Sequence, residues 1–90
     1  GLASEAASAV LDVGFGQINL AEIVSFTALP NLKSQAVMQR IGMQRLYSFE
    51  HPNVPIGSPL RTHILFSIAQ QHWLKNNESN KSMSINSNSQ

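Results

Sequence analysis

The chain has 90 residues, a net charge of +1 and no cysteine, which allows one small domain without disulfides, thiolate chemistry or cysteine-based metal sites. Its six Lys and Arg residues are scattered and no long apolar run occurs, so the sequence predicts neither a nucleic-acid nor a membrane partner. No signal-peptide pattern is present, and a cytoplasmic location is the expectation.

The first predicted element is an amphipathic helix that begins at the first residues. Small and apolar side chains recur from Ala3 to Ile18 with the three-then-four spacing of one helix face. Gly14 and Gly16 each lower the helix propensity by about 1 kcal/mol relative to alanine. We therefore expect the helix to fray or turn at residues 16–19.

Three segments have the alternation and the β-branched or aromatic content of strands, namely residues 22–28, 45–51 and 62–68. In the third, Ile64, Phe66 and Ile68 share one face. The second and third segments are predicted to pair as an antiparallel hairpin, because the proline-containing loop 51–59 continues neither strand. Both faces of residues 22–28 are expected to be at least partly covered. Residues 69–74 could extend the last strand or form a terminal turn.

A second, shorter helix is predicted between the first two strands. Asn31 occupies an N-cap position, where its side-chain oxygen can accept a backbone N–H that has no helical partner. Gly42 can adopt the left-handed conformation that ends a helix. The resulting order of helix, strand, helix, strand, strand predicts an α/β fold.

The last sixteen residues, 75–90, contain five Asn and five Ser and have only Met83 and Ile85 as apolar side chains. Such a segment buries too little surface to offset the entropy of ordering it. We therefore expect a disordered polar tail at 75–90 and a folded domain at 1–74.

Five segments together resemble the GNAT superfamily of acetyl-coenzyme A dependent N-acetyltransferases, and most of all its branch of ribosomal-protein alanine N-acetyltransferases. These segments are Gly1 to Ala6, Glu22 to Thr27, Asn31 to Met43, Phe49 to Pro52 and Pro59 to His63. The resemblance implies the C-terminal half of a GNAT fold, with a mixed sheet and without the N-terminal strands. It also implies an N-acetyltransferase or a fragment of one, and a fragment alone is expected to be inactive.

The resemblance further implies roles for individual residues toward acetyl-coenzyme A. The backbone N–H groups of Gly1, Leu2, Ala3 and Ser4 would hold the cofactor pyrophosphate. The Asn31 side chain would bond to the pantetheine arm, and Ser34 would face the thioester sulfur and assist the departing thiolate. Many family members place a tyrosine acid where this chain has Met38, which cannot donate a proton. The implied reaction is transfer of an acetyl group to an amine of a protein N-terminus or of a small molecule.

Plainer interpretations remain open at each of these positions. Asn31 can be a helix cap alone, and Ser34 an ordinary residue of a first turn. Glu50 and His51 are adjacent in a strand and point to opposite faces, so no metal site is predicted. The alternative function is a non-catalytic remnant or interaction module of the same fold. In either case, an open edge of strand 22–28 would favour self-association.

Overall fold

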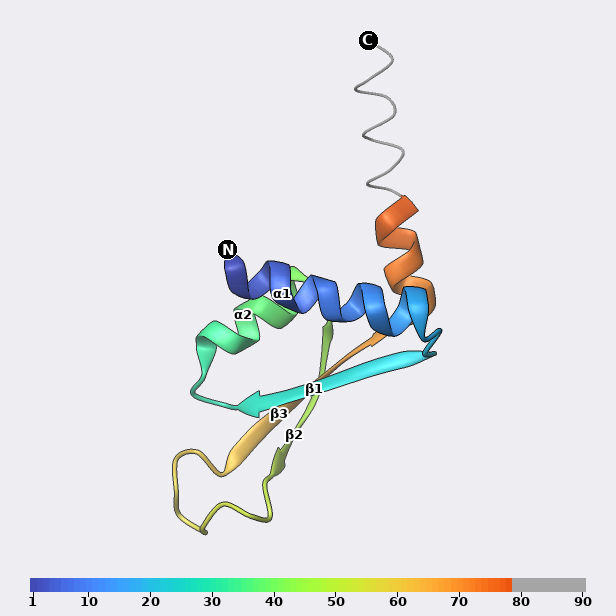
Figure 1. The fold of residues 1–90 in the computed structure, drawn as a ribbon. Coiled ribbons are helices and arrows are strands. Elements are labelled where there is room, and N and C mark those ends of the chain that lie inside the picture. The colour runs from blue at the N-terminus through green and yellow to red at the C-terminus, as the bar shows by residue number, and fades with distance from the viewer. Residues whose placement is uncertain (79–90) are drawn as a thin grey trace.

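The computed structural model describes residues 1–78. Its elements follow in the order α1 (Leu2–Leu11), the π-helix η1 (Asp12–Gln17), β1 (Glu22–Ala28), α2 (Leu32–Arg40), β2 (Gln44–Glu50) and β3 (Thr62–Ala69). This order confirms the predicted α/β fold (Figure 1).

The first helix continues directly from α1 into η1 and ends at Gln17, where the sequence predicts a turn. Asn19 follows with a φ of 64°, a left-handed conformation that asparagine tolerates, and the chain then enters β1. Gly14 packs closely against this strand, since a Cβ atom there would lie 2.5 Å from Cδ1 of Ile23. The π-helical winding was not predicted.

The three strands form one sheet in the order β1-β3-β2, with β3 in the centre. Phe26 of β1 pairs with Leu65 of β3, and Phe49 of β2 pairs with His63 of β3. The predicted antiparallel hairpin of β2 and β3 is confirmed, with an irregularity between Arg45 and Tyr47. All pairing between the described strands is antiparallel, so the mixed character implied by the family resemblance is absent from this part of the sheet.

The core lies between one face of the sheet and the first helix. It consists of Leu11, Phe15, Met43, Ile64, Phe66 and Ile68. The three residues from β3 are those that its alternation assigns to one face, and Ile64 and Phe66 are completely buried. In β1 the face with Ile23, Ser25 and Thr27 lies toward the helices, and the other face is covered only in part, because Val24 and Phe26 are 52% and 53% exposed.

Residues 70–78 form a helix, whereas the sequence predicts an extension of the last strand or a terminal turn for residues 69–74. Tertiary contacts stabilise it: the Trp73 and Phe15 rings lie 5.4 Å apart, and Gln70 Nε2 donates to the Phe15 carbonyl at 3.0 Å. Residues 75–78, predicted as the start of a disordered tail, belong to this helix. The rest of the predicted tail, residues 79–90, lies outside the described residues.

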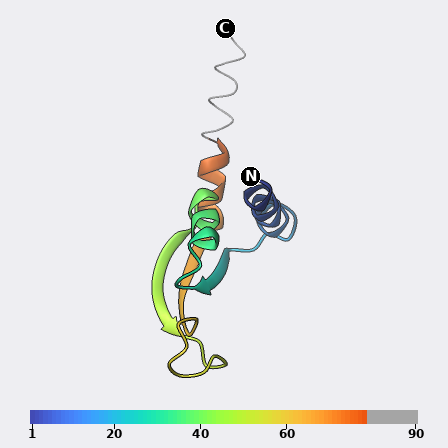
Figure 2. The same ribbon diagram turned by 90° about the vertical axis from the view of Figure 1, so that its left-hand side faces the viewer.

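Figures 1 and 2 show the helix at residues 70–78 and the loop between β2 and β3 at opposite ends of the sheet. The first turn of α1 lies beside α2 in both views, and Arg40 at the end of α2 reaches Ser4 in α1. The two helices and β1 therefore surround a common space.

Candidate functional site

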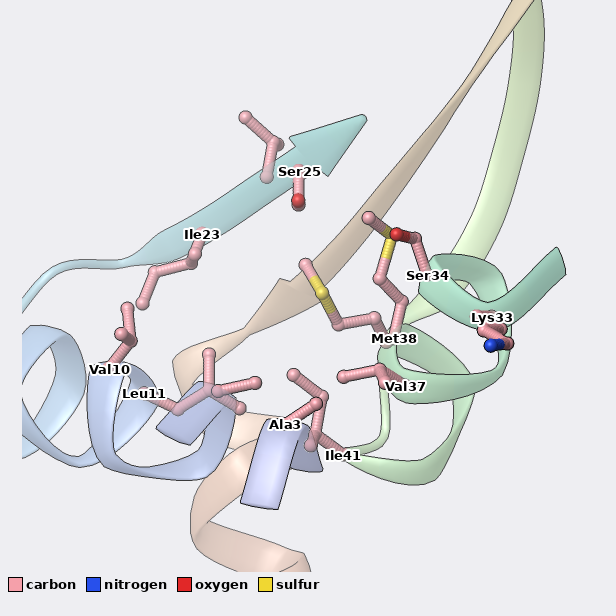
Figure 3. Close-up of a pocket in the computed structure, with 13 residues that line it drawn as sticks. Ala3, Val10, Leu11, Ile23, Ser25, Lys33, Ser34, Val37, Met38 and Ile41 are labelled. Atoms are coloured by element: carbon pink, nitrogen blue, oxygen red, sulfur yellow. The ribbon is translucent and has the colours of Figure 1, made fainter. Parts of the chain in front are cut away.

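A cavity of about 450 Å³ occupies the space between α1, β1 and α2 (Figure 3). Its lining from α1 is Ala3, Ala7, Val10 and Leu11, and from β1 it is Ile23, Val24 and Ser25. The remaining lining comes from α2 and the segment after it, as Lys33, Ser34, Val37, Met38, Ile41 and Met43. Three elements that are separate in sequence thus share one site.

The local sequence explains why this space stays open. Ala3 and Ala7 are one helical turn apart on α1, and their short side chains leave room between the two helices. Ser34, Met38 and Ile41 follow each other along one face of α2 at spacings of four and three. The walls are mostly apolar, and their polar side chains are those of Ser25, Lys33 and Ser34. Such walls suit a largely aliphatic chain with a few polar groups.

Asn31 caps α2 as the sequence predicts. Its side-chain Oδ1 accepts a hydrogen bond from the backbone N–H of Ser34 at 3.2 Å, and Gly42 ends the helix region with a φ of 95°. Asn31 is exposed and is not among the residues that line the cavity. The cap interpretation is therefore confirmed, and contact with a pantetheine arm remains a prediction.

Ser34 is half-buried in the first turn of α2 and lines the cavity. Met38 lies one turn further along the same wall, where many family members are expected to carry a tyrosine acid. Met38 also packs against the core, and Met43 belongs to it. A hydroxyl and two thioethers thus face this part of the cavity.

The start of α1 presents backbone donors. The first helical hydrogen bond runs from the Glu5 N–H to the Gly1 carbonyl at 3.1 Å, so the N–H groups of Leu2, Ala3 and Ser4 precede the helical ladder. Of the four predicted pyrophosphate-binding residues, Ala3 lines the cavity, and Gly1 and Ser4 line a neighbouring groove. Leu2 is 84% exposed. Cofactor binding by these groups remains a prediction.

Three further residues that shape the site are not predicted from the sequence. Ser25 lines the cavity from β1. Arg40 donates from Nη1 to the Ser4 hydroxyl at 3.4 Å, which places a guanidinium beside the start of α1. Gln35 is only 8% exposed, and its Nε2 donates to the Leu29 carbonyl at 2.7 Å, which ties α2 to the end of β1. The sequence signal for this contact is a polar side chain, Gln35, on the side of α2 that faces the protein interior.

A second cluster lies at the end of the sheet near the loop between β2 and β3. The His51 and His63 rings are 4.9 Å apart, and Phe26 and Phe49 lie against them. His51 Nδ1 bonds to the Asn53 N–H and His63 Nδ1 to the Arg61 carbonyl, so one nitrogen of each ring is engaged. Within residues 1–78, no group of three or more His, Cys, Asp or Glu side chains is placed to hold a metal ion.

None of the helices in the described part of the chain is both long enough and apolar enough to cross a membrane. This observation concerns residues 1–78 alone.

Comparison with known proteins agrees with this arrangement. Residues 1–44 match the model of the acetyltransferase (GNAT) domain. An uncharacterized N-acetyltransferase of Bacillus subtilis, YnaD, is 36% identical over 73 residues, which cover 81% of this chain and 42% of that protein. The chain thus spans less than half the length of this curated relative.

Solved structures show the same fold. An acetyltransferase of the GNAT family from Bacillus anthracis is 34% identical, with a TM-score of 0.69 over 79% of this chain and 42% of that one. A mutant form of the spermidine/spermine N-acetyltransferase SpeG from Vibrio cholerae has a TM-score of 0.76 at 21% identity, over 86% of this chain and 44% of that one. At that identity the likeness concerns the fold alone. The matches support membership of the GNAT acetyltransferase superfamily, and the chain carries part of the GNAT fold.

Proposed function

We propose that the chain is the cofactor-binding part of an N-acetyltransferase that moves an acetyl group from acetyl-coenzyme A to an amine. The observation that carries this proposal is the cavity between α1, β1 and α2. It brings Ala3, at the helix start assigned to the pyrophosphate, and Ser34, assigned to the thioester, into one space. GNAT enzymes in general use acetyl-coenzyme A, and the walls suit its pantetheine arm.

In this proposal the start of α1 and the start of α2 have separate tasks. The free N–H groups of Gly1, Leu2, Ala3 and Ser4 hold the pyrophosphate, because a helix start offers oriented donors and a favourable dipole. Arg40 beside them adds positive charge. The Asn31 amide bonds to the pantetheine arm, and Ser34 donates to the sulfur as negative charge develops on it.

The chemical step is attack of a neutral amine on the acetyl carbonyl. The amine nitrogen forms a bond to the carbonyl carbon, the carbon–sulfur bond breaks, and the amine loses a proton while the thiolate gains one. Ser34 can assist only the departing sulfur, because a serine hydroxyl is a poor base near neutral pH without a neighbouring base. Met38 cannot take this role. The base that receives the amine proton is not assigned to any described residue.

The acceptor is an amine of a protein N-terminus or of a small molecule. Within the superfamily, the sequence resemblance favours the branch of ribosomal-protein alanine N-acetyltransferases, and a cytoplasmic setting belongs to the same proposal. Relatives named as spermidine N-acetyltransferases make a polyamine a necessary member of any test panel.

Calorimetric titration of the chain with acetyl-coenzyme A tests the cofactor half of this proposal. We expect saturable binding with one molecule of cofactor for each chain. Acetylation of spermidine and of peptides with an N-terminal alanine, followed by mass spectrometry in the protein that contains this chain, tests the acceptor half. Absence of cofactor binding would overturn the proposal.

A non-catalytic interaction module is the second candidate. It is favoured by the uncovered edge and face of β1, where Val24 and Phe26 are half exposed. This candidate predicts binding of another chain without binding of acetyl-coenzyme A. The same titration therefore separates the two functions.

A further inference from the structure

Of the seven serines in the described residues, Ser8 and Ser48 are exposed, and the other five differ in what their hydroxyls contact. Those of Ser4, Ser58 and Ser67 form hydrogen bonds to other protein groups. Ser25 and Ser34 do not belong to this group, and both are half-buried in the cavity between α1, β1 and α2. Burial of a hydroxyl without a partner is unfavourable, so a molecule that closes this cavity must offer polar groups to both.

Ser25 stands at a position where strand packing alone would favour another residue. It lies on the side of β1 that faces the helices, between the partly buried Ile23 and the buried Thr27. A β-branched apolar residue would fit a pleated, half-buried surface better than serine. The hydroxyl is therefore not explained by the packing of β1 against its neighbours.

Figure 3 shows Ser25 on β1 and Ser34 on α2, on different walls of the cavity. Both walls carry aliphatic side chains around the hydroxyl, from Ile23 on β1 and from Val37 on α2. A ligand held between them meets a hydrogen-bonding group on each side and apolar surface elsewhere. The pantetheine arm has this chemistry, because its amide groups are separated by short aliphatic stretches.

We propose that Ser25 is a further residue that positions the cofactor, with its hydroxyl donating a hydrogen bond to an amide carbonyl of the pantetheine arm. This inference rests on the proposed function and adds β1 as the wall that orients the arm toward Ser34. Ser25 takes no part in bond making. It fixes the arm so that the thioester reaches Ser34 on the opposite wall.

The test compares two ligands on the full 90-residue chain: coenzyme A, and adenosine 3′,5′-bisphosphate, which lacks the arm. In Ser25→Ala, calorimetry should show that coenzyme A binds about five- to tenfold more weakly, because one hydrogen bond is lost. The affinity for adenosine 3′,5′-bisphosphate should not change. Ser25→Thr keeps a hydroxyl and should stay within about twofold of the original affinity for coenzyme A. Ser48→Ala, at an exposed position of β2 outside the cavity, is the matched control and should change neither affinity.

Each other outcome overturns the assignment. Equal losses for both ligands in Ser25→Ala, accompanied by a lower melting temperature, would show that Ser25 only supports the fold. Unchanged coenzyme A affinity in that variant, while the original chain binds the cofactor, would remove Ser25 from the site and leave the proposed function intact. Failure of the original chain to bind coenzyme A would overturn both proposals together.

Discussion

Asn31 has one observed task and one proposed task, and substitutions can separate them. The observed task is the cap, in which Oδ1 accepts the Ser34 N–H. The proposed task uses the amide as a partner for the pantetheine arm. Aspartate retains an oxygen for the cap and removes the amide N–H donor.

We expect Asn31→Ala to lower the free energy of unfolding by about 1 kcal/mol through loss of the cap. It should also weaken acetyl-coenzyme A binding by about 1 to 3 kcal/mol, because a desolvated partner on the arm would be left unpaired. Asn31→Asp should keep the stability and show the loss of affinity. Calorimetric titration and thermal melting of both variants provide the measurements. Full affinity in both would leave Asn31 as a cap alone.

Ser34 is predicted to act late in the reaction, on the departing thiolate. In the protein that contains this chain, Ser34→Ala should lower kcat, change cofactor affinity little and leave the pH optimum where it was, because the group that accepts the amine proton lies elsewhere. Steady-state kinetics across a pH series is the measurement. Gln39→Ala, on an exposed side of α2, is the control and should retain full activity.

Two results would contradict this role. If the pH–rate profile of Ser34→Ala lost the limb that reports amine deprotonation, Ser34 would belong to the group that accepts the amine proton. An unchanged kcat would leave it as a structural residue of the helix.

At the scale of the elements, the end of α2 depends on one backbone conformation. Gly42 has a φ of 95°, and a Cβ atom there would lie 3.0 Å from Asn76 Nδ2, so a side chain meets both backbone strain and crowding. Gly16 lies in the π-helix η1, and its Cβ atom would lie 3.6 Å from the Trp73 ring, at ordinary contact distance. The two glycines should therefore respond in opposite ways to the same substitution.

Gly42→Ala is expected to lower the free energy of unfolding by about 1 kcal/mol or more, because alanine disfavours the left-handed conformation. Gly16→Ala should leave stability unchanged or raise it by about 0.5 to 1 kcal/mol, since alanine is the better helix former. Denaturant unfolding monitored by circular dichroism measures both. Equal destabilisation would show that the end of α2 makes no special demand on residue 42.

At the scale of the whole molecule, the sheet has edges that no described strand covers. Among the described strands, β1 pairs only with β3, and its outward face exposes Val24 and Phe26. Unpaired strand edges with apolar side chains tend to pair with other chains. The interface between copies would lie along β1.

The isolated chain is therefore predicted to self-associate. Sedimentation velocity at several concentrations should show dimers or larger species, and Val24→Lys should shift them toward the monomer, because the charge opposes strand addition. Ser48→Lys on β2 is the matched control and should leave association unchanged. An original chain that stays monomeric at every concentration would contradict the prediction.

Local signals in the sequence were sufficient for most elements of the fold. Asn31 and Gly42 delimit α2 through a side-chain cap and a left-handed backbone, and both effects act within a few residues. The alternation of Ile64, Phe66 and Ile68 identifies the buried face of β3, because side chains in a strand point to opposite faces in turn. These features require no knowledge of distant residues.

Only the tertiary structure decided the features that depend on contacts between distant segments. Residues 70–78 are helical, with the Trp73 ring against Phe15 and the Gln70 side chain bonded to the Phe15 carbonyl. No local sequence pattern predicts these contacts. Ser25 shares a cavity with Ala3 and Ser34 because the packing of α1 and α2 beside β1 brings the three together. Helix caps and strand alternation act over a few residues, whereas the helix at 70–78 and the site depend on the packing of whole elements, which short-range patterns do not encode.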